Sequence, residues 1–388
     1  MKKITFYLFL FLLLLLPDLG FGQPPLKVGV LIPFTGRWGD SGRECAKGML
    51  DAGKWLNQRE GVFGRKLEML LIDDTSQPAE TMAAYRKLNE ADRILLLYIY
   101  SMETVRALIP HIHFDRIPTL TSSLPSHFTT SFKYPYVFSV TPTPLDLSRI
   151  AMKFIVERSG IKGRKVKVLF VGSPDFSGQH FLDEAKEYAR ALGLDIGPDI
   201  WTSDFSSTKM ILPSLSTINQ YNPDYAYLSL TSKEALLMLQ EARKMDLKTK
   251  WICNMRAFDE NLLPFDGVFG VQPISPLGED IPGMAVIKEA HQRWHPYDSH
   301  TLSYIEGWAT TQVIAEALGR SLPEQRLSRE WVKISLEGFK DFVLGGLIPP
   351  MTISHNDHRP SLESRIFVIK DGKLSRFTSF ISLDRARK

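Results

Sequence analysis

Residues 94–100, ILLLYIY, form an almost unbroken apolar run that leads directly into Ser101. Such a run is typical of a β-strand that is buried on both faces, as in a parallel sheet covered by helices. The next residues, 101–113, have the pattern of a helix. This strand–helix pair predicts an α/β fold built on mostly parallel sheets.

The same alternation extends along the first part of the chain. Ser41 and Glu44 have the spacing of a capping box, which predicts that a helix begins at Ser41. The predicted elements around residues 94–113 are strands at 26–33, 67–72 and 118–121, a helix from Ser41 onward and a helix over 78–91.

A second series begins after Pro142 and Pro144, which indicate a joint between two α/β units. It comprises helices 146–159, 177–192, 208–220 and 232–246 and strands 165–171, 199–202, 225–230 and 250–253. Three later helices, at 284–295, 302–319 and 328–337, lack strong strands between them and are expected to complete the first unit. The tail, 365–370 and 373–378 around Asp371-Gly372, predicts a β-hairpin.

Residues 1–22 have the features of a secretory signal peptide. Lys2 and Lys3 precede an apolar run at 6–16, and Gly20 and Gly22 supply small residues before the expected cleavage site. The run is well short of the roughly 20 residues that span a bilayer. No cysteine follows it for a lipid anchor, so we expect a soluble protein exported to the periplasm.

Composition argues against several functional classes. A net charge of +4 over 388 residues, without a basic cluster, disfavours nucleic-acid binding. Two cysteines exclude a disulfide scaffold or a cysteine zinc site, and Cys45 and Cys253 are expected to be free thiols in different units. The sequence has no phosphate loop, dinucleotide fingerprint, nucleophile elbow or zincin motif, so we expect neither a cofactor nor an enzyme.

Three polar groups leave a choice between chemistry and structure. His111 and His113 are two residues apart, which suits surface positions on a helix better than one metal ion. The segment with His355, Asp357 and His358 is either a polar turn or a metal site, and the turn is favoured. Asp73-Asp74 follows a strand and either caps the next turn and helix or supplies acid–base carboxylates; capping is favoured.

Polar residues follow two of the predicted strands at their carboxyl ends, where open α/β sheets bind ligands. Tyr100-Ser101 opens a helix, whose N-terminal N–H groups attract anions; Ser101 either holds a carboxylate or only caps the helix. Thr121-Ser122-Ser123 ends the next strand. Trp38, in the first strand–helix turn, either forms an apolar wall for a ligand or only packs within its loop.

The chain resembles the type I periplasmic solute-binding proteins of ABC importers, in particular the leucine/isoleucine/valine-binding group. The resemblance rests on the order and spacing of many segments rather than on one motif. They include VGVLIPFTGRWGDSG at 28–42, NPDYAYLSLTSKEALLMLQEARKMDLKTKWI at 222–252 and GFKDFVLGGLIPPMTIS at 338–354.

This resemblance implies two α/β lobes joined by three crossovers and closing over a ligand by hinge motion. It assigns residues 23–141 and 272–349 to lobe 1 and residues 142–271 and 350–388 to lobe 2.

The resemblance also suggests site residues. Ser101 would hold the ligand carboxylate, Trp38 and Phe176 would be the aromatic positions of the two lobes, and Thr231 takes the place of a family tyrosine. The family acid that receives the ligand ammonium would fall near Met255, where this chain has Asn254-Met255-Arg256, unless Asp259 replaces it. Arg256 would repel an ammonium and attract a carboxylate.

The expected function is therefore capture of a small carboxylate-bearing solute, an amino acid or a related organic acid or amide, for delivery to an ABC permease. We expect a monomer with no nucleic-acid partner and no direct membrane anchor. The alternative is a sensory binding protein of the same fold that acts on a membrane receptor, and an exported enzyme is disfavoured.

Overall fold

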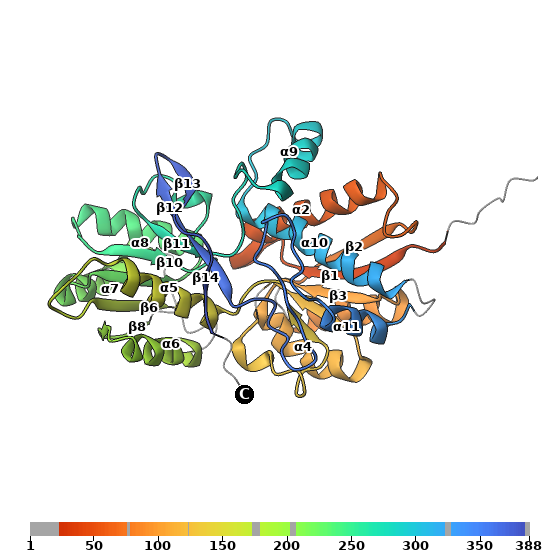
Figure 1. Ribbon diagram of the computed structural model, residues 1–388, viewed down its shortest axis with the longest axis horizontal. Helices are drawn as coiled ribbons and strands as arrows, with labels where there is room; N and C mark the ends of the chain where they lie inside the picture. Colours follow the sequence, from red (N-terminus) through yellow and green to blue (C-terminus); the bar gives the residue numbers. More distant parts are fainter. Residues whose placement is uncertain are drawn as a thin grey trace, which may run out of the picture.

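The computed structural model describes residues 23–75, 78–122, 124–172, 179–201, 207–322 and 327–384. They form two α/β lobes lying side by side, as the sequence predicted (Figure 1). The proposed signal peptide, residues 1–22, lies outside the described residues. Across the described ranges, every helix is too short or too polar to cross a bilayer.

The sheet of lobe 1 contains, among the described residues, five parallel strands in the order β2-β1-β3-β4-β5. Its strand β3 lies within the apolar run at residues 94–100, and all four residues of the strand are buried. The strands are β1 (Leu26–Ile32), β2 (Leu67–Asp73), β3 (Leu96–Ile99), β4 (Thr119–Thr121) and β5 (Val137–Ser139). The helices are α2 (Gly39–Asn57), α3 (Pro78–Arg86), α4 (Met102–Asp115), α9 (Pro282–Trp294), α10 (Leu302–Ser321) and α11 (Arg329–Glu337).

The sheet of lobe 2 follows the order β13-β12-β11-β10-β9-β6-β7 in the described part of the chain, with β8 beside β6 and β14 beside β12. Strands β6 to β11 pair in parallel, whereas β12, β13 and β14 pair antiparallel. The strands are β6 (Lys167–Gly172), β7 (Asp195–Ile196), β8 (Ile200–Trp201), β9 (Tyr225–Ser229), β10 (Lys250–Cys253), β11 (Phe269–Gln272), β12 (Glu363–Lys370), β13 (Lys373–Arg376) and β14 (Ile381–Ser382). The helices are α5 (Pro144–Arg158), α6 (Gln179–Ala191), α7 (Thr208–Tyr221) and α8 (Ser232–Lys244).

The predicted C-terminal hairpin is confirmed. Lys370 pairs with Lys373, and the two residues between them, Asp371 and Gly372, have φ angles of 51° and 65°. Positive φ at both central positions is what a two-residue type I′ turn requires, and Asp-Gly tolerates it well.

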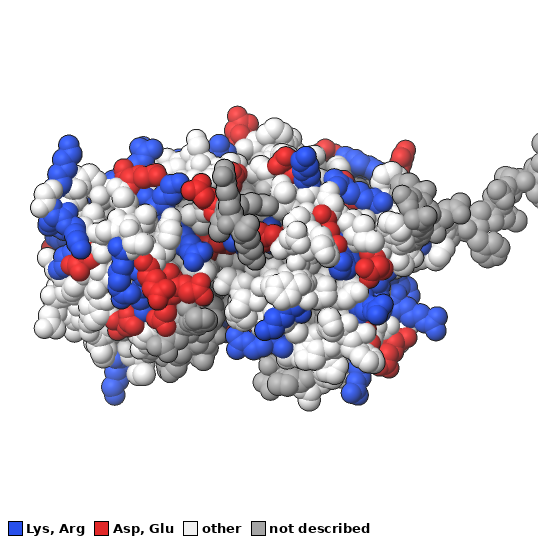
Figure 2. All heavy atoms as spheres, turned by 60° about the horizontal axis from the view of Figure 1, so that its bottom comes forward, with Lys and Arg blue, Asp and Glu red and all other residues white. Residues whose placement is uncertain are grey.

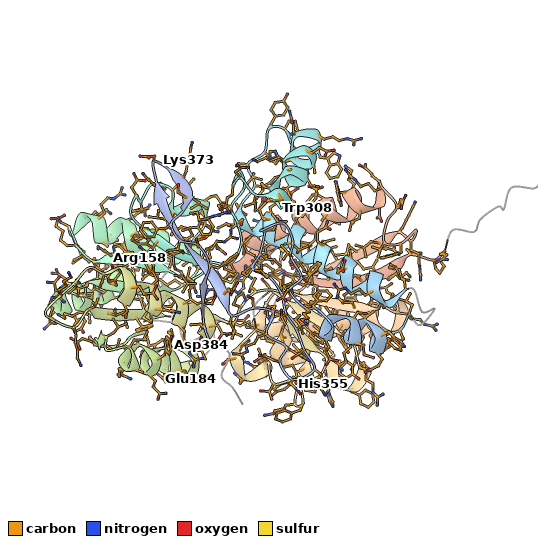
Figure 3. All side chains as sticks on the ribbon, in the orientation of Figure 1. Arg158, Glu184, Trp308, His355, Lys373 and Asp384 are labelled. Carbon is orange, nitrogen blue, oxygen red and sulfur yellow. The ribbon has the colours of Figure 1, made fainter. Side chains whose placement is uncertain are left out.

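Helices α9, α10 and α11 return to lobe 1, as expected from their lack of intervening strands (Figure 1). The chain then stays on lobe 1 as far as His358 before crossing to β12. The His358 ring stacks on Phe138 of β5 with 4.0 Å between ring centroids, and its nitrogens bond Val137 O and the Glu337 carboxylate. Figure 3 places the neighbouring His355 on the same lobe.

The polar-turn interpretation of this segment is confirmed, since Ser354 and Asp357 pair across it. Nowhere in the described ranges do three His, Cys, Asp or Glu side chains gather closely enough to hold a metal ion. His111 and His113 are exposed on α4, as predicted. Cys45 and Cys253 are buried free thiols in different lobes, also as predicted.

One local prediction is wrong, one strand was missed, and two predicted elements are found with small differences. Helix α2 begins at Gly39, before Ser41, and the Ser41 hydroxyl donates to Trp38 O, so the proposed capping box is wrong. The short strand β5 was not predicted, because its three residues are too few for a periodic pattern. The predicted strand at 199–202 is represented in the described residues by β8, with β7 before it, and the predicted helix 78–91 ends as a π-helix over Lys87–Ala91.

Helices α2 and α10 cross in lobe 1 at two glycines. A Cβ on Gly48 would overlap the backbone oxygen of Tyr304, and a Cβ on Gly307 would overlap that of Cys45. Trp308 of α10 packs beside this crossing, inside lobe 1 (Figure 3). The two glycines therefore set how closely the helices can approach.

We predict that Gly307→Ala destabilises the protein by about 1–3 kcal/mol, because the new methyl group must push backbone apart. Urea denaturation followed by circular dichroism measures this change. Gly53→Ala on α2 is the matched control: its Cβ would have its nearest neighbour at 3.7 Å, and alanine favours helix. Equal stability of Gly307→Ala and the native chain would contradict the close crossing.

Candidate functional site

Two chambers lie between the lobes, and both are bordered by Trp38, Met255 and Arg256. The first has about 530 Å³ of empty space and mainly apolar walls. It is lined by Trp38, Tyr100, Ser101, Met102, Glu103, Pro144, Leu147, Tyr227, Asn254, Met255 and Arg256. The second has about 980 Å³ and is lined mainly by polar and charged residues, among them Arg37, Asp40, Glu44, Thr231, Lys233, Asp259 and Glu306. Both chambers are open to solvent to a similar degree, and both volumes include part of that solvent space.

The first chamber meets lobe 1 at the N-terminus of α4. Ser101 is the N-cap of this helix, and its hydroxyl oxygen accepts a hydrogen bond from Thr104 N at 3.2 Å. The Thr104 hydroxyl in turn donates to the buried Asp74 carboxylate at 2.6 Å. Because the N–H groups of Met102 and Glu103 have no acceptor within the helix, this end of the chamber is suited to an anion.

The structural interpretation of Asp73-Asp74 is therefore confirmed for the turn after β2, and the helix that Asp74 is seen to support is α4. Asp73 accepts hydrogen bonds from Phe34 N at 3.0 Å and Thr75 N at 3.2 Å, which fixes the turns after β1 and β2. Asp74 holds the first turn of α4 through Thr104. The capping role of Ser101 is also shown, and it leaves the helix N–H groups beside it available to a ligand.

Arg256, which follows β10 in lobe 2, reaches into lobe 1. Its Nη1 and Nη2 donate to the two oxygens of Glu306 in α10, at 2.7 and 2.9 Å. The same nitrogens donate to the Tyr100 hydroxyl at 2.8 Å and to the Ser122 hydroxyl. All four Nη hydrogens of the guanidinium are thus directed at groups of lobe 1.

The Arg256–Glu306 pair is buried, since the two side chains are 12% and 2% exposed. Burial disfavours the charge of Arg256, but the Glu306 carboxylate outweighs this effect and raises the pKa of the guanidinium above its ordinary value. The charge of Arg256 is therefore already compensated within the protein.

Further contacts join the lobes at the rim of the cleft. Arg37 pairs with Glu234 at 2.9 Å, and Lys233 pairs with Asp40. Leu302 N, at the start of α10, donates to the Glu260 carboxyl oxygens at 3.1 and 3.2 Å. Burial, together with the neighbouring Asp259 charge, raises the pKa of Glu260 to about 8.

Most of the remaining predicted site residues lie at this cleft. Trp38 borders both chambers, and Thr231 borders the second while capping α8 through its own hydroxyl and Glu234. Thr121 and Ser122 are buried at the end of β4, where Ser122 accepts from Arg256. Ser123 and Phe176 lie outside the described residues.

Sequence reasoning missed three residues at the site. Glu306 is a buried acid in the apolar helix α10, an unusual position that could have marked it as the partner of a cation. Leu147 on α5 and Tyr227 on β9 line the first chamber, but their patterns match those of ordinary core residues.

We compared the chain with family profiles, curated proteins and solved structures. A profile of the family described as periplasmic binding protein matches residues 25–373. No curated protein matches the chain.

Among solved structures, a fatty acid ABC transporter substrate-binding protein from Thermomonospora curvata is similar with a TM-score of 0.82 and 20% identity, covering 94% of each chain. A branched chain amino acid ABC transporter protein from Thermus thermophilus with bound valine has the same score and identity, covering 93% of this chain and 96% of that one. A solute binding protein from R. palustris in complex with benzoate has a TM-score of 0.77 and 17% identity, covering 93% and 98%.

We predict that Glu306→Gln destabilises the protein by about 3 kcal/mol, because it leaves the buried Arg256 charge without its counter-charge. It should also open the lobes, which small-angle scattering would register as an increased radius of gyration. Arg37→Gln is the matched control, since it removes a cross-lobe charge pair at the exposed rim, where such pairs contribute little. An unchanged radius and stability in Glu306→Gln would refute the structural role of the pair.

Proposed function

Because the chain belongs to the periplasmic binding protein family, we propose that it captures a small carboxylate-bearing solute between its lobes and delivers it to an ABC permease. The observation that carries the proposal is the first chamber, which has the α4 N-terminus on lobe 1 and apolar walls contributed by both lobes. The family is one of binding proteins and not of enzymes, as the sequence predicted.

In this proposal the carboxylate binds at the N-terminus of α4. The Met102 and Glu103 N–H groups and the helix dipole supply a partial positive charge there, with Ser101 holding the first turn in place. Trp38 and Tyr100 form aromatic walls of the chamber. Arg256 also lines this chamber but contributes little free charge, since Glu306 neutralises it.

The remaining predicted residues keep supporting roles. Thr121 and Ser122 hold the end of β4 beside the cleft, and Thr231 lies at the rim of the second chamber. Ser123 and Phe176 remain proposals that rest on the resemblance alone.

The geometry favours an organic acid with an apolar body over a branched-chain amino acid. An α-ammonium would need a carboxylate partner. The two oxygens of Glu306 are already bound to Arg256, and Glu103, the carboxylate in the lining of the first chamber, belongs to an exposed residue of α4. The solved relatives named above include proteins described with a fatty acid, valine and benzoate, so the fold accommodates several kinds of body.

Delivery to the permease would follow closure of the lobes, with the protein acting as a monomer in the periplasm after removal of residues 1–22. Both lobes carry intermingled positive and negative side chains on the face shown in Figure 2, as the near-neutral charge of the chain leads one to expect. A sensory role in the same compartment would use the same cleft, and the presence of a neighbouring permease gene would separate the two roles.

A thermal-shift screen tests the proposed solute class. We expect benzoate or octanoate to raise the melting temperature, since a ligand present at 100 times its Kd stabilises by about 2.7 kcal/mol. Leucine should give little or no shift at the same concentration. Micromolar or tighter binding of leucine by calorimetry would sink the preference for a lone carboxylate.

We further predict that Ser101→Ala weakens binding of the solute that the screen identifies, because the first turn of α4 loses its cap beside the carboxylate. Stability should fall by about 1 kcal/mol. Thr231→Ala, which removes the cap of α8 outside the first chamber, should lower stability similarly and leave affinity almost unchanged. Calorimetry on both variants checks this, and equal affinities in the two would count against the α4 site.

A further inference from the structure

The hydroxyl of Tyr227 is buried and has no hydrogen-bond partner among the described residues. Tyr227 lies in the middle of β9 and is fully buried. A buried polar group without a partner destabilises a protein, so each such group calls for an explanation. Other buried tyrosines are satisfied: the hydroxyls of Tyr85, Tyr136 and Tyr304 donate to carboxylates.

The described residues that pack around Tyr227 within lobe 2 are apolar or aromatic. Its ring packs against Phe170, with 5.7 Å between centroids, and it shares an apolar cluster with Leu147 and Met255. Burial raises the pKa of Tyr227 above its ordinary value, so the hydroxyl keeps its proton and can donate.

Tyr227 also lines the first chamber, on the lobe 2 side. On the lobe 1 side the chamber is lined by the α4 N-terminus, where we place the solute carboxylate. The rest of the lining is mainly apolar and includes Trp38, Met102, Leu147 and Met255.

Asn254 is the other uncharged polar side chain on the lobe 2 side of this chamber, and it is already engaged. Its Oδ1 accepts from Arg256 N at 3.1 Å and from Ala257 N at 2.7 Å, and its Nδ2 donates to the Ser229 hydroxyl at 3.5 Å. Tyr227 differs from Asn254 in that no described residue bonds its buried hydroxyl.

We propose that the Tyr227 hydroxyl binds a polar group on the solute at the end opposite its carboxylate. The solute class is then a carboxylate whose apolar body carries a hydroxyl or carbonyl group at its far end. Such a molecule bridges the lobes, because lobe 1 binds its carboxylate and lobe 2 its second polar group. This inference rests on the proposed function, and it makes Tyr227 a determinant of specificity.

The test compares 4-hydroxybenzoate with benzoate, which differ only by a hydroxyl group, against the native protein and Tyr227→Phe. The protein is first unfolded, dialysed and refolded to remove any bound solute. By calorimetry, the native protein should bind 4-hydroxybenzoate about tenfold more tightly than benzoate, equivalent to about 1.4 kcal/mol. Tyr227→Phe should lose this difference and bind benzoate as the native protein does.

Tyr225→Phe is the matched control, because Tyr225 lies on the same strand but outside the chamber. It should keep the preference for the hydroxylated acid. Equal affinities for the two acids in the native protein, or an unchanged preference in Tyr227→Phe, would overturn the proposal.

Melting of the solute-free proteins tests the unpaired hydroxyl separately. Tyr227→Phe should melt at the same temperature as the native protein or higher, because it removes a buried group that lacks a partner. A lower melting temperature would reveal a partner within the protein and overturn the proposal. If neither acid binds the native protein, the proposed function fails for these solutes, and the melting result still decides the status of Tyr227.

Discussion

The closed arrangement of the two lobes depends above all on the pairing of Arg256 with Glu306. A guanidinium that leaves water must find a carboxylate and enough acceptors, or its burial is strongly unfavourable. Here the guanidinium comes from lobe 2, and the carboxylate and both hydroxyl acceptors come from lobe 1. This buried pair therefore links the lobes beside both chambers, together with the contacts of Arg37, Lys233 and Glu260 at the rim.

The parallel sheets explain why the binding groups meet at this cleft. In each lobe the carboxyl ends of the central strands point toward the other lobe, so the segments after β3, β4 and β10 converge there. The helix that follows β3 directs its N-terminal N–H groups to the same place, where we propose that the solute carboxylate binds. The apolar side chains of α5 and β9 then supply walls from the opposite lobe.

Several polar residues beside the cleft stabilise helix ends and turns of the protein itself. Ser101 caps α4, Thr231 caps α8, and Asp73 and Asp74 hold the turns that lead into these elements. Their structural roles do not conflict with binding, because the capped helix ends still present N–H groups to the cleft. Tyr227 is the exception, because its buried hydroxyl has no hydrogen-bond partner among the described residues.

The sequence alone determined the two α/β lobes, the return of the late helices to lobe 1, the terminal hairpin and the free state of both cysteines. These follow from local information: the period of apolar residues, prolines at the joint, and Asp-Gly at a turn. Sequence also located Ser101 at a helix N-terminus, since a strand–helix junction is a local feature. It misjudged the start of α2, where Ser41 lies inside the helix and donates to Trp38 O, and it missed β5, because a three-residue strand leaves no periodic signal.

Only the tertiary structure decided what Arg256 does. In the sequence it stood as a cation without a partner, because Glu306 is 50 residues away and Tyr100 and Ser122 are in the other lobe. Tertiary packing brings these groups together, and it also leaves the Tyr227 hydroxyl without a hydrogen-bond partner among the described residues.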